Sequence, residues 1–543
     1  MRSNESLVLA ALATVFLAAC GGGTNTTPVN TSGTQGVLLY NPPARVGSVT
    51  AADFAAQVGA TPAGAQLLLV TGAPVCGIDF HYIQYYTVGG ANEPTNASGA
   101  LMVPTGPAGT CSGARPILLY AHGTASTRGY NIANPSDPTN EGSTESGLIA
   151  AMFAAHGYIV VAPNYAGYDS SPLPYHPFVN GVALAGDMIN ALAAARSALG
   201  HVPAAATLDS GKLFISGYSA GGYVAMATHK AMQAARMPVT AAAPMSGPYA
   251  LSSFGDAIFF GNVNLGSTEF APLIISSYQN SYPNDPLYMA TTDIVETKYA
   301  TGFATLLPGL SFSTLVQQGK LPLTELFNNT VPTVTATTCS SALVSGTLAA
   351  ILPAVTPPTV PPAEAPLFAL GFGPSNLITN SYRVNYLCDA VAHPDGVVGA
   401  QLGIGPLTGL PPASPMQPVR VDLKLNDMRS WVPMTAPVLL CGGNADPTVF
   451  YSVNTGVMQA FWTPQLAAPQ LLTVLDVDSA PTGVTDPFAA AKVGFATAKG
   501  AVAAAAVAAG AKDGGAQAVT LAYHGTLVPP FCSAAARGFF SQF

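Results

Sequence analysis

Apolar runs of two lengths alternate along most of this chain. Short runs at residues 115–123 and 158–163 alternate with longer runs of helical period at 147–157 and 181–200. The short runs are continuously apolar, which is typical of parallel strands buried on both faces. Strands and helices that alternate in this way predict an α/β fold with a mostly parallel central sheet and helices on both faces.

The same pattern predicts more elements before and after these four. Residues 80–88 and 97–104 are expected to form an antiparallel pair across a Gly-Gly-Ala-Asn turn. Further strands are expected at 65–72, 211–217, 239–244, 436–443, 469–477 and 517–525. Further helices are expected at 220–236, 450–462 and 486–509.

Between residues 249 and 432 the alternation stops. This segment has aromatic clusters and a proline-dense stretch at 352–367, yet its composition is too apolar for a linker. We therefore expect 249–432 to be a large cap or lid inserted into the sheet domain. The two parts of that domain are then 37–248 and 433–543.

A G-x-S-x-G motif lies where a predicted strand meets a predicted helix. Ser219 stands between strand 211–217 and helix 220–236. Gly217 and Gly221 flank it, and glycine lets backbone segments approach where a side chain would clash. A serine raised on a sharp strand-to-helix turn is typical of a catalytic nucleophile, so Ser219 is the candidate.

A serine hydroxyl needs a base to remove its proton and an acid to orient that base. In sheets of this type the three groups occur in the chain order serine, acid, histidine. His524 is the only histidine after Leu439, which leaves it as the candidate base. Asp446 follows the predicted strand 436–443 at the sheet edge where such folds bind ligands, and it is the preferred acid. Two other aspartates near the end of a predicted strand are alternatives: Asp476 and Asp478.

Acyl transfer also requires hydrogen-bond donors for the oxyanion. The amide of Ala220, directly after the nucleophile, is one predicted donor. The second is expected from the loop after strand 115–123, where the Thr124 amide is preferred and the Gly123 amide is the alternative. His122 in the same loop is expected to orient the loop rather than to transfer a proton.

Five segments of the predicted sheet domain carry a shared pattern: AHGT at 121–124, APNYAGY at 162–168, GYSAGG at 217–222, PVLLCGGNADPTV at 437–449 and YHG at 523–525. Together they resemble the α/β-hydrolase superfamily, and the large insertion before the acid is similar to secreted lipases and carboxylesterases of the secretory-lipase group. The resemblance implies hydrolysis of carboxylic esters through an acyl-enzyme, without a metal or an organic cofactor. Two alternatives remain: a serine peptidase or other amide hydrolase on the same fold, and a non-catalytic surface binding protein.

Composition and charge limit the classes of partner that this chain can bind. Of 543 residues, 49% are hydrophobic and 8% are charged, which excludes a disordered, solvated chain. The formal net charge is -8 with only 18 Lys and Arg, so no basic stripe is available to displace counterions from nucleic acid. The expected partner is a small-molecule or lipid ester.

The N-terminus predicts export. The uncharged run from Leu7 to Ala19 spans 13 residues, whereas a membrane-spanning helix needs about 20. It ends in small residues as a secretory signal does. The sequence Leu-Ala-Ala-Cys at 17–20 resembles the lipobox of bacterial lipoproteins, which implies a signal peptide at 1–19, lipid attachment at Cys20 and a place in the bacterial cell envelope. The alternative is an ordinary secretory signal. In either case, residues 20–36 are expected to form a flexible tether.

Six cysteines follow Cys20, and an even number in an exported chain predicts disulfides. Proximity in the sequence favours the pairs Cys76 with Cys111, Cys339 with Cys388, and Cys441 with Cys532. Buried reduced thiols are the alternative. No C-x-x-C pair occurs and the histidines are scattered, so no metal site is expected.

Overall fold

The computed structural model describes residues 34–202, 207–361 and 363–543, and nine strands in these residues form one sheet. Their order across the sheet is β1-β2-β3-β5-β4-β6-β7-β8-β9. The strands are β1 (Ala44–Val49), β2 (Gly77–Val88), β3 (Pro94–Thr105), β4 (Gly113–Ala121), β5 (Ile159–Pro163), β6 (Thr207–Tyr218), β7 (Ala241–Met245), β8 (Val438–Gly442) and β9 (Leu472–Asp476).

The sheet is mostly parallel, as predicted. Strands β5, β4, β6, β7, β8 and β9 pair in parallel, whereas β1, β2 and β3 form an antiparallel edge that joins the rest through β5. Every residue of β5, β7 and β8 is buried. Continuous burial explains their unbroken apolar sequences, because helices cover both faces of these central strands.

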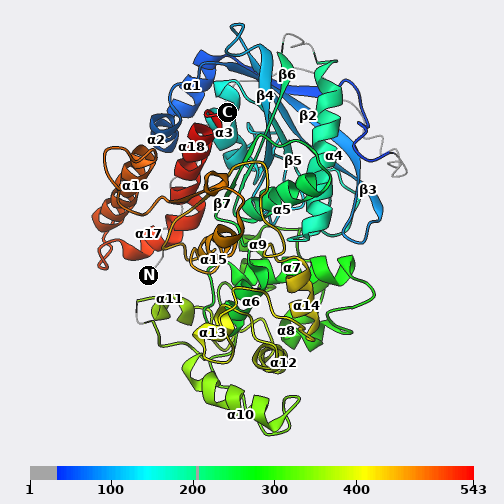
Figure 1. Ribbon diagram of the computed structural model, residues 1–543, viewed down its shortest axis with the longest axis vertical. Coiled ribbons are helices and arrows are strands. Elements are labelled where there is room, and N and C mark those ends of the chain that lie inside the picture. Colours follow the sequence, from blue (N-terminus) through cyan, green and yellow to red (C-terminus); the bar gives the residue numbers. More distant parts are fainter. Residues whose placement is uncertain (1–33, 203–206, 362) are drawn as a thin grey trace. The chain divides into compact units, whose positions relative to one another are not determined.

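Two groups of helices cover the two faces. Helices α4 (Gly181–Leu199) and α5 (Ala220–Ala234) pack against each other and against the sheet on one side. Helix α18 (Val528–Phe540) packs on β7 and β8, with α2 (Pro62–Thr71) and α3 (Ser143–Met152) beside it. Figure 1 shows these two groups on opposite sides of the strands. The remaining helices of the sheet domain are α1 (Ala51–Gly59), α15 (Thr455–Trp462), α16 (Ala489–Ala508) and α17 (Ala516–Ala522).

The strand predicted at 65–72 is wrong, because these residues belong to helix α2. Thr61 caps this helix by accepting a hydrogen bond from the Gly64 amide at 3.0 Å, and Pro62 occupies its first position. Both are helix-start signals. The short apolar run itself does not distinguish a strand from a buried helix turn.

The strand predicted at 517–525 is also wrong. These residues form α17 and the beginning of a π-helical turn, Tyr523–Leu527. The Asp513 carboxylate accepts hydrogen bonds from the amides of Gly515 and Gln517 and so starts the helix. An acidic group near a helix N-terminus is stabilised by the helix dipole, and this signal lies outside the apolar run.

Residues 249–432, called the insertion below, contribute helices and no strand to the sheet in the part of the chain that the structure describes. Figure 1 shows these helices gathered at one end of the sheet. They are α6 (Leu251–Phe259), α7 (Ser267–Ser281), α8 (Thr297–Ala300), α9 (Phe312–Gln317), α10 (Ala342–Ile351), α11 (Ala365–Ala369), α12 (Asn380–Ala392), α13 (Val398–Gln401) and α14 (Pro418–Leu425).

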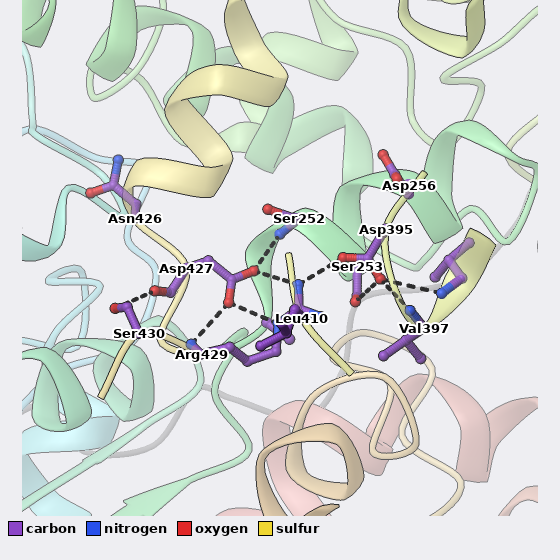
Figure 2. A network of polar contacts seen from close by, with 12 residues as sticks. Ser252, Ser253, Asp256, Asp395, Val397, Leu410, Asn426, Asp427, Arg429 and Ser430 are labelled. Atoms are coloured by element: carbon purple, nitrogen blue, oxygen red, sulfur yellow. Dashed lines mark hydrogen bonds and ion pairs between the residues drawn. The ribbon is translucent and has the colours of Figure 1, made fainter. Parts of the chain in front are cut away.

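A buried ionic network joins the two ends of the insertion (Figure 2). The Arg429 guanidinium lies 2.8 Å from a carboxylate oxygen of Asp395 and 2.8 Å from one of Asp427, and all three side chains are fully buried. The Ser253 hydroxyl donates to Asp395 at 2.6 Å, and the Ser252 amide donates to Asp427 at 3.0 Å. Because the serines start α6 and Arg429 lies near the end of the insertion, the network holds entry and exit together.

Replacing Arg429 with methionine should lower the free energy of unfolding by about 3–5 kcal/mol, because two carboxylates would then be buried without a counterion. Urea unfolding of the purified protein measures this cost. The control is Arg196→Met, which removes an exposed pair with Asp209 and should cost at most about 1 kcal/mol. Equal costs for the two variants would contradict the role of the network.

Three disulfides are present in the described residues, in the pairing that proximity favours. They are Cys76–Cys111, Cys339–Cys388 and Cys441–Cys532. The last one ties β8 to α18, and the second lies within the insertion. Disulfides of this number are typical of proteins that fold in an oxidising compartment.

The N-terminal predictions fall almost entirely outside the described residues. This applies to the signal peptide 1–19, to Cys20 and to most of the tether 20–36. At the end of the predicted tether the Gly36 amide donates to the Tyr86 carbonyl on β2 at 2.8 Å. The chain therefore already contacts the sheet at Gly36.

Candidate active site

Ser219 occupies the turn between β6 and α5. Its backbone angles are φ 59° and ψ −127°, a region that non-glycine residues rarely adopt. The Ser219 amide donates to the Met245 carbonyl at 3.0 Å, which anchors the turn to β7. Strain of this kind persists only where the surrounding structure enforces it, and it is concentrated at functional sites.

The two flanking glycines allow three backbone segments to meet beneath the serine. A Cβ atom on Gly217 would lie 2.3 Å from the Gly221 carbonyl oxygen, and one on Gly221 would lie 2.1 Å from the Ala121 carbonyl oxygen. Both distances are far inside van der Waals contact. Any side chain at either position would push the end of β4 away from the start of α5.

The structure brings Ser219, His524 and Asp446 together from three distant parts of the chain. His524 Nε2 lies 2.8 Å from the Ser219 hydroxyl, and His524 Nδ1 lies 2.6 Å from Asp446 Oδ2. The Asp446 side chain is 1% exposed and the His524 side chain 12% exposed. A buried acid, a base and a serine in the cavity wall, in hydrogen-bonding order, can activate the hydroxyl as a nucleophile.

Asp446 is held in one orientation by its own loop. Its Oδ1 atom accepts hydrogen bonds from the amides of Thr448 and Val449, at 2.9 and 3.0 Å. Its Oδ2 atom is thereby directed at His524. The carboxylates of the alternative acids, Asp476 and Asp478, accept hydrogen bonds from other residues.

Those two aspartates support the loops around the site. Asp476 accepts from the backbone and side-chain amides of Asn444, at 3.1 and 2.7 Å. Asp478 accepts from the Tyr523 hydroxyl at 2.8 Å and pairs with Lys499. Asp478 thus fixes the residue before His524 and does not contact His524 itself in the described structure.

His524 projects from the π-helical turn and not from the expected strand. The Tyr218 hydroxyl donates to the His524 carbonyl at 2.6 Å and fixes this turn against the end of β6. π-helical turns are rare and are frequent at functional sites. Tyr218 was not among the predicted site residues, although its place directly before Ser219 was an available signal.

The predicted oxyanion donors lie beside Ser219. Ala220 is the first residue of α5, where an amide has no acceptor within the helix and the helix dipole favours negative charge. Thr124 lines the same cavity as Ser219 and Ala220. The Gly123 amide donates to the Glu145 carboxylate at 3.1 Å, so the alternative donor is already engaged.

His122 is part of the support of this loop. Its ring stacks between Tyr130 and Tyr165, with both centroid distances 4.2 Å, and its two nitrogens lie 2.7 and 3.2 Å from the carbonyls of Gly123 and Asn164. Burial lowers the pKa of His122 to about 4, although the two contacts with backbone carbonyls by themselves raise the pKa. These contacts join the neutral, enclosed imidazole to the loop and to Asn164, and its role in orienting the loop stays a prediction.

A cavity of about 120 Å³ opens at Ser219 and runs between the sheet domain and the insertion. Its walls are almost entirely apolar. They include Phe178 and Pro248 from the sheet domain, Phe254 and Ile258 from α6, Phe270 and Ile274 from α7, Tyr382 from α12, and Val419 and Leu423 from α14. No sequence motif indicated these residues, because they converge from separate helices. Among the described residues no cluster of His, Cys, Asp and Glu is arranged to hold a metal ion.

No family model and no curated protein match this sequence. Solved structures do. The rice cell wall degrading esterase LipA from Xanthomonas oryzae, in a ligand-bound form, is 23% identical with a TM-score of 0.61, over 93% of this chain and 98% of that chain. A protein from Legionella pneumophila is 18% identical with a TM-score of 0.54, over 81% and 91% of the two chains. With the strand order and the turn at Ser219, these likenesses confirm that this chain has the α/β-hydrolase fold.

Proposed function

We propose that this protein is an exported serine hydrolase that cleaves carboxylic esters. The observation that carries the proposal is the hydrogen-bonded order of Asp446, His524 and Ser219 at the mouth of an apolar cavity. The esterase name of the Xanthomonas neighbour agrees with it. The three disulfides support export, and a lipid anchor at Cys20 is part of the proposal.

The first half of the proposed reaction forms an acyl-enzyme. The Ser219 oxygen attacks the ester carbonyl while His524 Nε2 takes the hydroxyl proton, and Asp446 stabilises the imidazolium. The amides of Ala220 and Thr124 hold the negative oxygen of the tetrahedral intermediate. The C–O bond to the leaving group then breaks, and His524 gives its proton to the departing alcohol.

The second half releases the acid. His524 removes a proton from water, the resulting hydroxide attacks the acyl carbonyl, and the second tetrahedral intermediate uses the same two amides. The bond to the Ser219 oxygen then breaks as His524 returns the proton to that oxygen. The net reaction consumes one ester and one water and requires no cofactor.

The apolar cavity indicates an ester with an extended acyl chain, and we propose that the insertion acts as the cap over it. Each buried methylene group contributes about 0.8 kcal/mol, which corresponds to about a fourfold gain in kcat/KM where the transition state keeps the contact. An apolar wall offers no partner for the amides of a peptide, and burying them without hydrogen bonds is costly. Esters are therefore favoured over peptides.

A panel of p-nitrophenyl esters tests the function and the chain preference together. We expect kcat/KM to rise from acetate to hexanoate by up to about fourfold per added methylene, and to level off when the chain fills the cavity. Peptide p-nitroanilides, assayed in parallel, should be hydrolysed far more slowly. A profile that falls from acetate onward, or a preference for the anilides, would contradict the proposal.

A further inference from the structure

Glu145 lies directly behind the loop that carries the second proposed oxyanion donor. It belongs to the first turn of α3 and accepts four hydrogen-bond contacts through its carboxylate. Oε1 accepts from the Tyr120 hydroxyl at 2.8 Å and from the Gly123 amide at 3.1 Å. Oε2 lies 3.3 Å from the same Gly123 amide and 3.4 Å from the Tyr130 hydroxyl.

Gly123, whose amide is anchored in this way, lies very close to Ser219. A Cβ atom built on Gly123 would lie 3.8 Å from the Ser219 Cβ atom and 3.5 Å from the Tyr218 carbonyl oxygen. The Gly123 amide and the Thr124 amide are separated by one α-carbon. Fixing the first therefore restricts the direction of the second, which lies beside Ser219 in the cavity wall.

We propose that Glu145 is a positioning residue, whose carboxylate holds the Gly123 amide so that the Thr124 amide faces the oxyanion of the reaction at Ser219. This inference rests on the proposed ester hydrolysis. Glu145 acts through the loop and does not touch the substrate. A charged acceptor holds an amide more strongly than a neutral one, so the ionised form is the effective form.

Because of its surroundings, the fraction of Glu145 that is ionised depends on pH near neutrality. Burial raises the pKa of Glu145 to about 7, against the lowering effect of the hydrogen bonds from Tyr120, Gly123 and Tyr130. No lysine or arginine pairs with Glu145 in the described ranges. Protonation below about pH 7 should therefore loosen the loop.

The neighbouring groups do not titrate in the same range. Burial raises the pKa of Tyr120, Tyr130 and Tyr165 well above 10, and burial lowers the pKa of His122 to about 4. All four thus stay neutral between about pH 5.5 and 8.5. The carboxylate of Glu141, which precedes α3, is directed at the amides of Ser126 and Thr127 instead.

The test is the ratio of wild-type to Glu145→Gln kcat/KM on p-nitrophenyl butyrate across pH. Glutamine keeps the shape and one carbonyl acceptor but has no charge at any pH. We expect a ratio of about 10 near pH 8.5, expressed mainly in kcat, that falls to about 1 near pH 5.5, where wild-type Glu145 is also protonated. A pH dependence that the two enzymes have in common cancels in the ratio.

Thermal unfolding separates positioning from a loss of fold. The pKa of Glu145 in the folded protein lies above its usual value of 4.5, so its contribution to stability is present below that value and is lost as pH rises through about 7. Glu145→Gln should therefore have a Tm at about pH 8.5 that is no lower than that of the wild type, although it is slower. A rate ratio that does not change with pH is the mark of a purely structural role and would overturn the proposal.

Two further variants test whether the pH dependence comes from Glu145. Tyr120→Phe removes a hydrogen bond that favours the carboxylate, so the midpoint of the pH-dependent step should move to higher pH; no shift would contradict the proposal. Asp422→Asn is the matched control. Burial and the nearby Asp285 raise the pKa of Asp422 to about 7. Its carboxylate forms no hydrogen bond to the loop of Gly123 and Thr124 in the described residues, so its rate ratio should be independent of pH.

The proposal and the function on which it rests fail differently. If the wild-type protein neither hydrolyses esters nor reacts with a fluorophosphonate at Ser219, the proposed function fails. If the wild type reacts and the ratio for Glu145→Gln stays constant with pH, only the role of Glu145 fails. The rate of fluorophosphonate labelling gives a second readout, since that reaction also develops charge on an oxygen beside Ser219.

Discussion

Ser219→Ala should lower kcat/KM for p-nitrophenyl butyrate by about 10⁵–10⁶-fold, because no acyl-enzyme can form without the Ser219 oxygen. The two oxyanion amides and the cavity remain, so substrate should still bind. Spectrophotometric release of p-nitrophenol measures the rate. Labelling with a fluorophosphonate, followed by intact-protein mass spectrometry, should show one adduct on the wild type and none on the variant.

Ser216→Ala is the matched control for this loss. Ser216 is buried on β6, three residues before Ser219, and its hydroxyl donates to the Ala243 carbonyl at 2.7 Å. Its replacement should cost about 1 kcal/mol of stability and leave the rate nearly unchanged. Retained activity in Ser219→Ala, with the signal absent from a protein-free blank, would remove Ser219 from its proposed role.

Asp446→Asn should lower kcat by about 10⁴-fold with little change in KM. The reason lies in the contacts of the carboxylate. One oxygen accepts from the amides of Thr448 and Val449, so the single carbonyl oxygen of asparagine is required at that position. The NH₂ group then faces His524 Nδ1 and donates to it. The imidazole must carry its own proton on Nε2, where it cannot accept the proton of Ser219.

Asp476→Asn is the control that separates the two acids. Asp476 also lies at the end of a parallel strand, as the last residue of β9, but it accepts from Asn444 and forms no hydrogen bond with His524 in the described residues. Asparagine there should leave kcat within a few-fold of wild type. If Asp476→Asn lost activity and Asp446→Asn retained it, the assignment of the acid would be reversed. Stopped assays of both variants on one ester decide this.

Local patterns predicted most of the sheet. Strands such as 158–163 and 436–443 are continuously apolar and short, and the structure places strands over both, at Ile159–Pro163 and Val438–Gly442. The two wrong strands, at 65–72 and 517–525, are apolar runs of similar length that form helices instead. Their capping residues lie outside the runs, so hydrophobic periodicity could not distinguish them.

His524 shows how a residue can be predicted on the wrong element. The expected strand is a helix that ends in a π-helical turn, yet the choice of histidine depended on chain order and not on local structure. Glu145 and Tyr218, in contrast, were not predicted as site residues at all. Both lie within short polar or mixed stretches, and their contacts with Gly123 and with His524 join elements distant in the sequence.

The amino-acid sequence by itself determined the alternation of strands and helices, the glycine-flanked serine and the order of the three polar groups, because each depends on neighbouring residues or on chain order. Only the tertiary structure decided the apolar cavity, the buried charges around Arg429 and the anchoring of Gly123 by Glu145. These features need side chains from segments far apart in the chain to meet. Their energies come from desolvation and burial, which have no value until the helices and the sheet pack together.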